Sequence, residues 1–290
     1  MNHNPIPTEL WEYLKTKYHA KDAQSIKGGT LNDVAKVTTD NQSFFVKWND
    51  ALLFPGMFEA EAEGLKLITN ANVGFAPQVI ETGEVEDASF LLLEYIKPGF
   101  RTYQSMEQLG ERLAQMHRQT QTQFGLHINN YMGILQQFNK PSDTWADFFI
   151  ESRLKPLVNK AFHMRLLELE DVSKFVELYQ KLPELFPAEQ PALLHGDLWN
   201  GNVMVNELEQ PILVDPACYF GNREADIAMT MLFGGFDRVF YEAYHANYPL
   251  ENGWQERVSL WNLYPLLVHL LLFGKAYKSE LVQSLRRNVA

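Results

Sequence analysis

The chain has 290 residues, of which 25 are Lys or Arg and 36 are Asp or Glu, giving a formal net charge of −11. This acidic balance argues against binding to nucleic acid and against docking on anionic membranes, because both need surplus cationic side chains. The composition is that of a globular protein, and the single cysteine, Cys218, excludes an intramolecular disulfide. The N-terminus lacks the features of a secretory signal, so a reducing compartment, the cytoplasm, is expected.

The first hundred residues predict a small lobe rich in β-strands. A helix is expected over Thr8–Tyr18, with Thr8 as its N-cap, and a second helix over Phe58–Ile68. A turn at residues 40–41 joins two strands into a hairpin, and an acidic turn over residues 81–87 separates the last two strands. The expected strands are Ser25–Ile26, Val34–Thr38, Ser43–Trp48, Gln78–Ile80 and Ser89–Ile96.

The remaining residues predict a larger helical lobe, and the two lobes join near residues 95–98. Expected helices lie over residues 106–116, 172–182 and 260–273, and two short strands, Asn202–Val205 and Pro211–Val214, interrupt the helical pattern. The chain after these strands is expected to be helical. This pattern predicts an α+β fold with an N-terminal lobe over residues 1–96 and a C-terminal lobe over residues 97–290.

Three polar residues in the second lobe form the pattern that is most informative about function. Asp197 precedes Asn202 by five residues, and Asp215 follows Asn202 by thirteen, at the end of an apolar triplet. Metal-dependent phosphoryl transfer requires this order, with Asp197 accepting the hydroxyl proton while Asn202 and Asp215 hold Mg²⁺ against the phosphates. The protein-kinase signature has the same order, with Arg where this chain has Gly196. A turn would explain His195-Gly196-Asp197 alone, but the added Asn and Asp favour a catalytic site.

Lys47 is the expected cation for the nucleotide phosphates. It lies within the apolar run 44–48, where a charge is costly unless it is paired. The helix that follows carries three glutamates, of which Glu61 is the preferred partner, while Glu59 and Glu63 stay open. An ordinary edge-strand lysine is the alternative interpretation.

Two further segments are candidates for binding ATP. Gly28 and Gly29 form a turn just before the hairpin, where backbone amides could cover the phosphates, although the turn has fewer glycines than a full Gly-x-Gly-x-x-Gly. Glu94, Tyr95 and Ile96 end the last strand of the small lobe, where backbone groups would meet the adenine base. An ordinary strand end is equally compatible with these three residues.

Longer motifs extend along nearly the whole chain. They are Gly28–Gly29, Phe45–Lys47, Met57–Glu61, Leu109–His117, Asn130–Gly133, Gln137–Asn139, Trp145–Phe149, His195–Asn202, Val214–Ala217, Arg223–Ala228 and Phe233–Phe236. Together they resemble the fructosamine kinase family, also called ketosamine kinases. The block from residue 130 to Arg153 is the most specific, because it separates this family from aminoglycoside phosphotransferases and choline kinases, which share the fold.

The resemblance implies a two-lobed protein-kinase-like fold and an ATP-dependent small-molecule kinase that uses Mg²⁺. Such enzymes phosphorylate the hydroxyl on the third carbon of the sugar part of a ketosamine, such as a ribulosamine or a fructosamine, free or bound to a protein. The phosphorylated adduct comes apart and frees the amine, so the family is described as deglycating. By the same resemblance, Asp197 matches the catalytic base, Asn202 and Asp215 match the metal ligands, and Lys47 with Glu61 matches the phosphate-binding pair.

Other residues of the motifs have expected roles of their own. The ring of Trp199 could stack on the apolar face of the sugar or simply pack. Hydrogen bonds of His195 and Asp226 are expected to hold the catalytic loop. The remaining histidines considered are expected to be structural, because no metal-type spacing links them: His117, His245 and His269.

The chain departs from the family pattern at several positions. Thr30 stands where many relatives carry Cys, so a thiol switch is not available there. Pro216 follows Asp215 in place of Phe-Gly, which argues against regulation by an activation loop. Val268 and Leu271 stand where Asn is expected around His269, which weakens any substrate assignment based on the last helices.

Two alternatives stay open from the sequence. The first is a kinase for another small hydroxylated amine, of the aminoglycoside, choline or homoserine type, which the acidic chain would also suit. The second is a nucleotide-binding module without catalysis. The sequence gives no indication of the oligomeric state.

Overall fold

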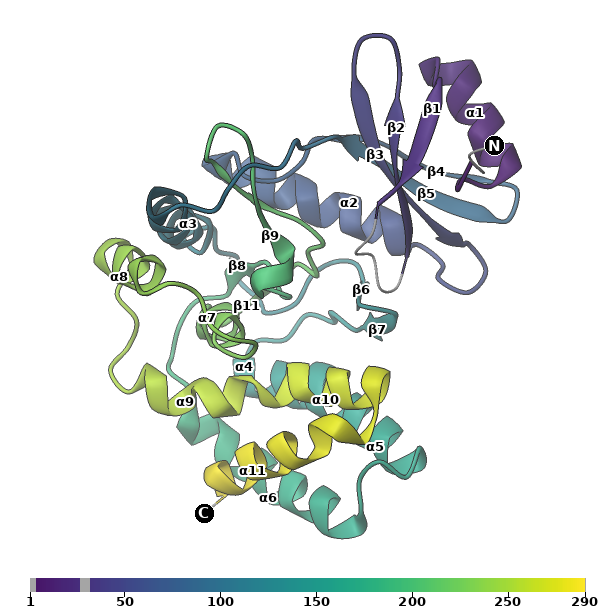
Figure 1. The fold of residues 1–290 in the computed structure, drawn as a ribbon. Coiled ribbons are helices and arrows are strands. Elements are labelled where there is room, and N and C mark those ends of the chain that lie inside the picture. Colours follow the sequence, from purple (N-terminus) through teal and green to yellow (C-terminus); the bar gives the residue numbers. More distant parts are fainter. Residues whose placement is uncertain (1–3, 27–31, 290) are drawn as a thin grey trace.

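A five-stranded antiparallel sheet forms the centre of the first lobe (Figure 1). The computed structural model describes residues 4–26 and 32–289, so the predicted Gly28 and Gly29, and Thr30 with them, lie outside the described residues. The strand order is β1-β2-β3-β5-β4, with bounds β1 Asp22–Ser25, β2 Asp33–Thr38, β3 Ser43–Asp50, β4 Val79–Val85 and β5 Ala88–Glu94.

One helix packs on each face of this sheet. Successive side chains of a strand point to opposite faces, so β3 serves both sides. Val46 is buried in the cluster that includes α1 (Thr8–Tyr18), whereas Phe45 packs on the other face, against the cluster of α2 (Met57–Ile68). The alternation places Lys47 on the α2 side of the sheet. It therefore directs the ammonium group toward the glutamates of that helix.

Two details of the first lobe differ from the sequence prediction. Thr8 is the first residue of α1 and not its N-cap, because the extended residue before it is Pro7. The predicted acidic turn is mostly strand, since β4 continues to its fifth residue and the turn keeps only the last two. Glu81 is tolerated in the strand because its carboxylate accepts hydrogen bonds from the hydroxyl groups of Tyr13 and Tyr18.

Helices make up most of the second lobe, at the left and in the lower part of Figure 1. Their bounds are α3 Tyr103–Met116, α4 Trp145–Phe148, α5 Lys155–His163, α6 Leu169–Leu185, α7 Glu224–Thr230, α8 Arg238–Asn247, α9 Trp254–Trp261, α10 Leu263–Phe273 and α11 Lys278–Val289. Short π-helical turns occur at η1 Thr69–Val73 and η2 Phe149–Leu154, and 3₁₀ turns at η3 Asn200–Asn202 and η4 Lys275–Tyr277. Among the described residues, no helix is long and apolar enough to cross a membrane.

Within residues 97–289, three antiparallel pairs of three-residue strands lie among these helices. The pairs are β6 Asn130–Met132 with β7 Leu135–Gln137, β8 Ala192–Leu194 with β11 Tyr219–Gly221, and β9 Val203–Val205 with β10 Pro211–Leu213. The prediction of β9 and β10 is confirmed to within one residue. The expectation that only helices follow them is wrong, because β11 returns to pair with β8. This pairing joins Tyr219 to Leu194 and Gly221 to Ala192, which are distant in the sequence, so no local pattern indicates it.

The predicted helix over residues 260–273 is also wrong as a single element. Asn262 ends α9 and precedes α10, and its side-chain amide donates a hydrogen bond to the backbone oxygen of Ala228 at 2.9 Å. Pro265 then falls in the first turn of α10, where a missing N–H costs little. The break lets α10 take a direction of its own, with one face toward the site described next.

Candidate active site

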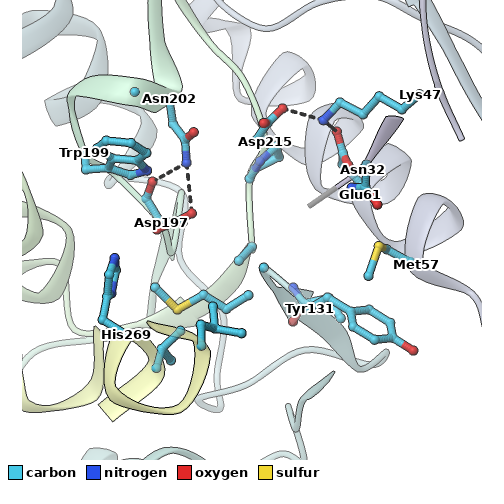
Figure 2. Close-up of a pocket in the computed structure, with 18 of the residues that line it drawn as sticks. Asn32, Lys47, Met57, Glu61, Tyr131, Asp197, Trp199, Asn202, Asp215 and His269 are labelled. Atoms are coloured by element: carbon cyan, nitrogen blue, oxygen red, sulfur yellow. Dashed lines mark hydrogen bonds and ion pairs between the residues drawn. The ribbon is translucent and has the colours of Figure 1, made fainter. Parts of the chain in front are cut away.

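One cavity between the two lobes, of about 300 Å³, collects most of the residues singled out from the sequence (Figure 2). Strand β3 and helix α2 supply its upper side, the loops after β8 and β10 supply the centre, and α10 supplies the floor. The predicted residues on its lining are Lys47, Glu61, Asp197, Trp199, Asn202 and Asp215.

Lys47 is held between two carboxylates. Its Nζ lies 2.7 Å from Oε1 of Glu61 and also contacts Oδ1 of Asp215, while only 5% of the lysine side chain is exposed. Burial works to lower the pKa of this ammonium group, but the carboxylates of Asp215 and Glu61 outweigh burial and raise its pKa. Burial raises the pKa of Glu61 against the opposing effect of Lys47, and we take the carboxylate as ionised because a charged ammonium lies within hydrogen-bond distance. Of the three glutamates open from the sequence, the structure therefore pairs Glu61 with the lysine.

The loop that carries Asp197 is shaped by a glycine. Gly196 has φ of +82°, and a Cβ at this position would lie 2.2 Å from the backbone oxygen of Ala217. Both the left-handed conformation and the close approach require glycine. The backbone N–H groups of His195 and Gly196 donate to the carboxylate of Asp226 at 2.7 Å and 2.9 Å. Asp226 thus anchors the loop, in agreement with the role expected for it.

His195 links the two aspartates through the backbone. Its Nδ1 accepts a hydrogen bond from the backbone N–H of Asp197 at 3.2 Å, so Nε2 carries the proton and donates to the oxygen of Val214 at 3.0 Å. Burial lowers the pKa of this imidazole, which favours the neutral form that the two contacts require. The imidazole of His195 thereby connects the backbone of Val214, the residue before Asp215, to the backbone of Asp197. His195 holds the loop and does not reach the cavity lining.

The Asp197 carboxylate has the electrostatic environment of a base that works near neutral pH. Burial raises the pKa of this carboxyl to about 7, and Asp215 and Asp226 add to the effect. The Nδ2 group of Asn202 opposes it by donating to Oδ2 of Asp197 at 2.9 Å, and it also donates to the backbone oxygen of Asp197 at 2.9 Å. General bases are most effective when their pKa lies near the working pH.

The same contacts orient the candidate metal ligands. Because both donated hydrogen bonds of Asn202 come from Nδ2, its Oδ1 is left to accept or to coordinate. Asp215 contributes a carboxylate whose side chain is 53% exposed. The described residues contain no group of three or more His, Cys, Asp or Glu side chains that could hold a metal ion. Two oxygen ligands on the lining of one cavity fit Mg²⁺, which takes its remaining ligands from phosphates and water.

Trp199 stands at the edge of the cavity. Its side chain is 38% exposed, and its ring packs over Gly201, where a Cβ would lie 2.4 Å from the indole. The ring centroid is 6.2 Å from that of Phe233. The indole is therefore packed on one side and still lines the cavity, where Figure 2 shows it near Asp197 and Asn202.

The predicted adenine segment does not line this cavity. The backbone N–H of Glu94 donates to the oxygen of Gln78 at 3.0 Å, and its carboxylate accepts from the N–H of Gln78 at 2.9 Å. Nζ of Lys36 lies over the ring of Tyr95, 4.6 Å from the ring centroid. The role of Glu94, Tyr95 and Ile96 in binding adenine stays a prediction, and the same holds for Gly28 and Gly29 outside the described residues.

The histidines that were expected to be structural lie in different surroundings. His117 is fully buried between the hydroxyl group of Tyr244 and the carboxylate of Asp226, in keeping with a structural role. His269, in contrast, lines the cavity from α10, which the sequence did not predict. Asn130 and Tyr131, on β6, also line it and were not singled out individually. Only the helical spacing of His269 from Pro265 and Phe273 could have placed it on the inner face of a helix.

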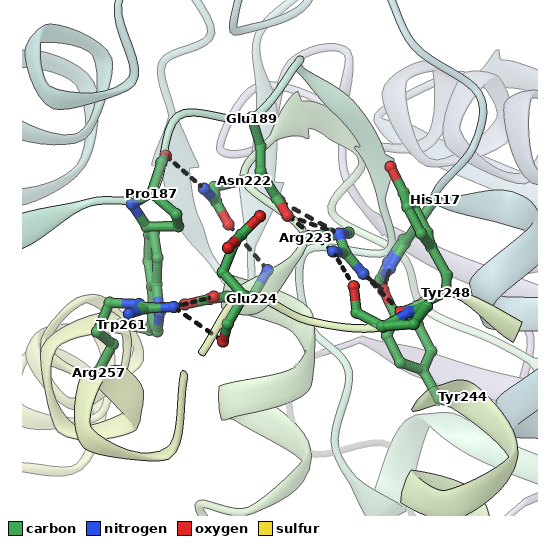
Figure 3. A network of polar contacts seen from close by, with 12 residues as sticks. His117, Pro187, Glu189, Asn222, Arg223, Glu224, Tyr244, Tyr248, Arg257 and Trp261 are labelled. Carbon is green, nitrogen blue, oxygen red and sulfur yellow. Dashed lines mark hydrogen bonds and ion pairs between the residues drawn. The ribbon is translucent and has the colours of Figure 1, made fainter. Parts of the chain in front are cut away.

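Buried ion pairs fix the helix that carries Asp226 (Figure 3). Arg223, just before α7, lies 2.7 Å from Glu189, and Glu224, the first residue of α7, lies 2.6 Å from Arg257. The indole N–H of Trp261 also donates to Glu224 at 2.9 Å. Because Arg223 and Glu224 are buried and each is paired with a partly exposed partner, they hold the start of α7 in one position. The anchor of the catalytic loop is therefore itself rigidly placed.

Comparison with known proteins identifies relatives along the whole chain. The family model described as fructosamine kinase matches residues 3–290. A probable ketoamine kinase of Enterococcus faecium is 37% identical over 262 residues, covering 90% of this chain and 92% of its own. The chloroplastic protein-ribulosamine 3-kinase of Arabidopsis thaliana is 35% identical over 266 residues, covering 88% of this chain and 79% of its own.

Solved structures agree with these relatives. The crystal structure of a Thermobifida fusca protein, provisionally named a fructosamine-3-kinase, superposes with a TM-score of 0.84 at 33% identity, covering 93% of this chain and 94% of that one. A spectinomycin phosphotransferase crystallised with ADP and spectinomycin has a TM-score of 0.61 at 17% identity, covering 98% and 94% of the two chains. The second likeness concerns the fold alone, and it confirms the predicted two-lobed, protein-kinase-like α+β architecture.

Proposed function

Since the chain belongs to the fructosamine kinase family, we propose that it transfers the γ-phosphoryl group of ATP to the third-carbon hydroxyl of the sugar part of a ketosamine. The observation that carries the proposal is the meeting, in one cavity, of a paired lysine with the Asp197, Asn202 and Asp215 set. The relatives named for ketoamines and ribulosamines support the substrate class. Phosphorylation on this carbon is expected to destabilise the adduct and free the amine.

Asp197 is proposed to receive the proton of the attacking hydroxyl. The hydroxyl oxygen forms a bond to the γ-phosphorus as the bond from that phosphorus to the bridging oxygen breaks, so ADP leaves and the hydroxyl proton moves to the carboxylate. The hydrogen bonds from Asn202 fix the carboxylate in one orientation for this transfer. Since little covalent work is left to the protein, positioning and charge stabilisation supply most of the catalysis.

Lys47 and its partners are proposed to bind the nucleotide phosphates. Glu61 holds the ammonium from the α2 side, so the lysine keeps its position when a phosphate takes over its contact with Asp215. Mg²⁺, when bound by Asn202 and Asp215, would neutralise the phosphate oxygens and so assist departure of ADP. Backbone groups at residues 28–29 and at residues 94–96 are proposed to cover the phosphates and the adenine. Trp199 is proposed to stack on the sugar.

Some earlier expectations stay predictions. The lobe boundary at residue 96 and the cytoplasmic location rest on the sequence pattern and composition alone. Ribulosamine is the first substrate to test, because one relative is named for it. Fructosamine, spectinomycin, choline and homoserine serve as the comparison set, and turnover of only one of the last three would favour the alternative kinase function.

The proposal is tested by mixing purified protein with MgATP and ribulosamine or fructosamine and measuring ADP release together with the phosphorus spectrum of the product. We expect a phosphate ester on the sugar, with turnover lost in Asp197→Asn. ATP binding without turnover on any of these acceptors would favour a non-catalytic nucleotide-binding module. Turnover by Asp197→Asn at the wild-type rate would refute the assignment of the base.

A further inference from the structure

Five aromatic rings form a series of contacts that starts at the catalytic loop, and three of them, Trp199, His269 and Phe273, line the cavity. The ring of Trp199 lies 6.2 Å from Phe233, and Phe233 lies 4.6 Å from His269, measured between centroids. His269 in turn lies 5.4 Å from Phe273 and 5.0 Å from Tyr277. We call these five residues the aromatic wall. They come from three separate parts of the chain, so the fold gathers the rings beside the proposed base.

Two rings of the aromatic wall that line the cavity are partly exposed to solvent. Phe273 is 50% exposed and Trp199 is 38% exposed, and both line the cavity. Val268 and Leu272 line it as well, so this part of the cavity floor is apolar. A substrate group on this side therefore meets rings and methyl groups.

His269 offers a hydrogen-bond acceptor to a ligand. Nδ1 of His269 lies 2.8 Å from the backbone oxygen of Pro265, and a carbonyl oxygen only accepts, so Nδ1 carries the proton. Burial lowers the pKa of this imidazole, which keeps the ring neutral near pH 7. Nε2 then bears a lone pair, and within the described part of the chain no hydrogen bond reaches it. Figure 2 shows the ring of His269 directed from α10 toward Trp199 and Asp197.

One carboxylate of the cavity favours a cationic group. Glu61 and Asp215 contact Lys47, the one cation among the lining residues in the described chain, whereas Asp197 has no cationic partner on the lining. A ketosamine carries a basic secondary amine next to the sugar, and its protonated form has N–H groups to donate. Cations are attracted to the faces of aromatic rings. The acidic lining disfavours a carboxylate on the same amine.

We propose that His269 and Phe273, the rings of the aromatic wall that line the cavity beyond Trp199, form the binding site for the amine part of the ketosamine. The secondary ammonium donates to Nε2 of His269 beside the ring of Trp199, and the group attached to the nitrogen runs out over Leu272 and Phe273. The preferred substrates are ketosamines whose amine bears an apolar or aromatic group and no neighbouring carboxylate. This inference rests on the proposed function and adds to it the class of amine.

The first test separates the amine group from the sugar. Wild type and Phe273→Ala are compared on the ribulosamines of benzylamine and of methylamine, which share the sugar and the nitrogen. We expect kcat/KM for the benzyl substrate to fall about tenfold in the variant, mainly through KM, as the loss of an aromatic contact of about 1.4 kcal/mol would give. The value for the methyl substrate and KM for ATP should change less than twofold. Phe162→Ala, at an exposed phenylalanine of α5 outside the cavity, is the matched control.

The second test addresses the ammonium contact. His269→Phe keeps a ring and removes the acceptor, so it should reduce the preference of the enzyme for the methylamine ribulosamine over 1-deoxyribulose, which lacks the nitrogen. Equal losses on both ribulosamines in Phe273→Ala, or an unchanged preference in His269→Phe, would overturn the inference while leaving the kinase function standing. Absence of turnover on every ketosamine by wild type would instead overturn the proposed function, and this inference with it.

Discussion

Replacing Asp197 by Asn should make the protein inactive and, above neutral pH, more stable. Burial raises the pKa of the folded-state carboxyl from 3.8 to about 7. A carboxyl with a raised pKa favours the folded state when protonated, so this contribution is present below about pH 3.8 and is lost as the pH rises toward about 7. Asn has nearly the same shape and no charge to bury. The wild-type protein therefore bears a cost at neutral pH that the variant avoids.

The size of the effect follows from the shift. At about 1.36 kcal/mol per pKa unit, the full shift from 3.8 to about 7 corresponds to at most about 4 kcal/mol of unfolding free energy. The carboxylate lines an open cavity and is partly solvated, so we expect about half of this value. When the pH is raised from about 5 to about 8, the unfolding free energy of the variant should therefore rise by roughly 1–2 kcal/mol relative to that of wild type.

Urea unfolding of both proteins at the two pH values, without Mg²⁺ and nucleotide, measures the difference. Asp237→Asn, at an exposed aspartate before α8, controls for the general effect of removing a negative charge from an acidic chain. A stability difference between Asp197→Asn and wild type that does not change with pH would refute the raised pKa. If Asp197→Asn is less stable than wild type at both pH values, the hydrogen bond from Asn202 to the Asp197 carboxylate stabilises wild type by more than the buried charge costs.

Three further substitutions test how the site is built. Glu61→Gln should lower kcat/KM for MgATP at least tenfold, because it removes one charge partner of a buried lysine. Glu59→Gln, on the exposed side of the same helix, should change kcat/KM less than twofold. Equal effects of the two substitutions would contradict the pairing of Glu61 with Lys47. Gly196→Ala should lower the melting temperature and abolish turnover. The new Cβ would clash with a backbone oxygen, and the left-handed conformation would add more than about 1 kcal/mol of strain. A melting temperature equal to that of wild type would refute the requirement for glycine. Asp226→Asn should lower kcat more than it raises KM for MgATP, because it loosens the loop and leaves the lysine site intact; a loss confined to KM would contradict the anchor role.

The residues that perform the chemistry were predictable because their order in the chain carries the information. Lys47 is conspicuous as a charge within an apolar strand, and the period of two directs it toward the helix that carries Glu61. The Asp, Asn, Asp order similarly identifies the loop between β8 and β10. The contact between Lys47 and Asp215 spans 168 positions, however, and only the packing of the two lobes creates it.

The parts that the sequence did not yield depend on tertiary contacts. Strands β8 and β11 have three residues each, and they pair because the chain returns after β10. The break at Asn262 depends on its hydrogen bond to α7, which no local pattern indicates. His269 is one of several apolar-flanked histidines in the sequence. It becomes a candidate ligand only because that break directs α10 toward the cavity.

The anchoring of the catalytic loop by Asp226 has a consequence for its dynamics. The amide protons of His195 and Gly196 are bonded to a buried carboxylate of α7 and not to a neighbouring strand. Their exchange with solvent deuterium therefore requires α7 to separate from the loop, which the ion pairs at the start of that helix resist. The loop amides and α7 should therefore become accessible to solvent in a single cooperative opening event. A segment with little regular secondary structure is thereby expected to exchange as slowly as the core of the second lobe.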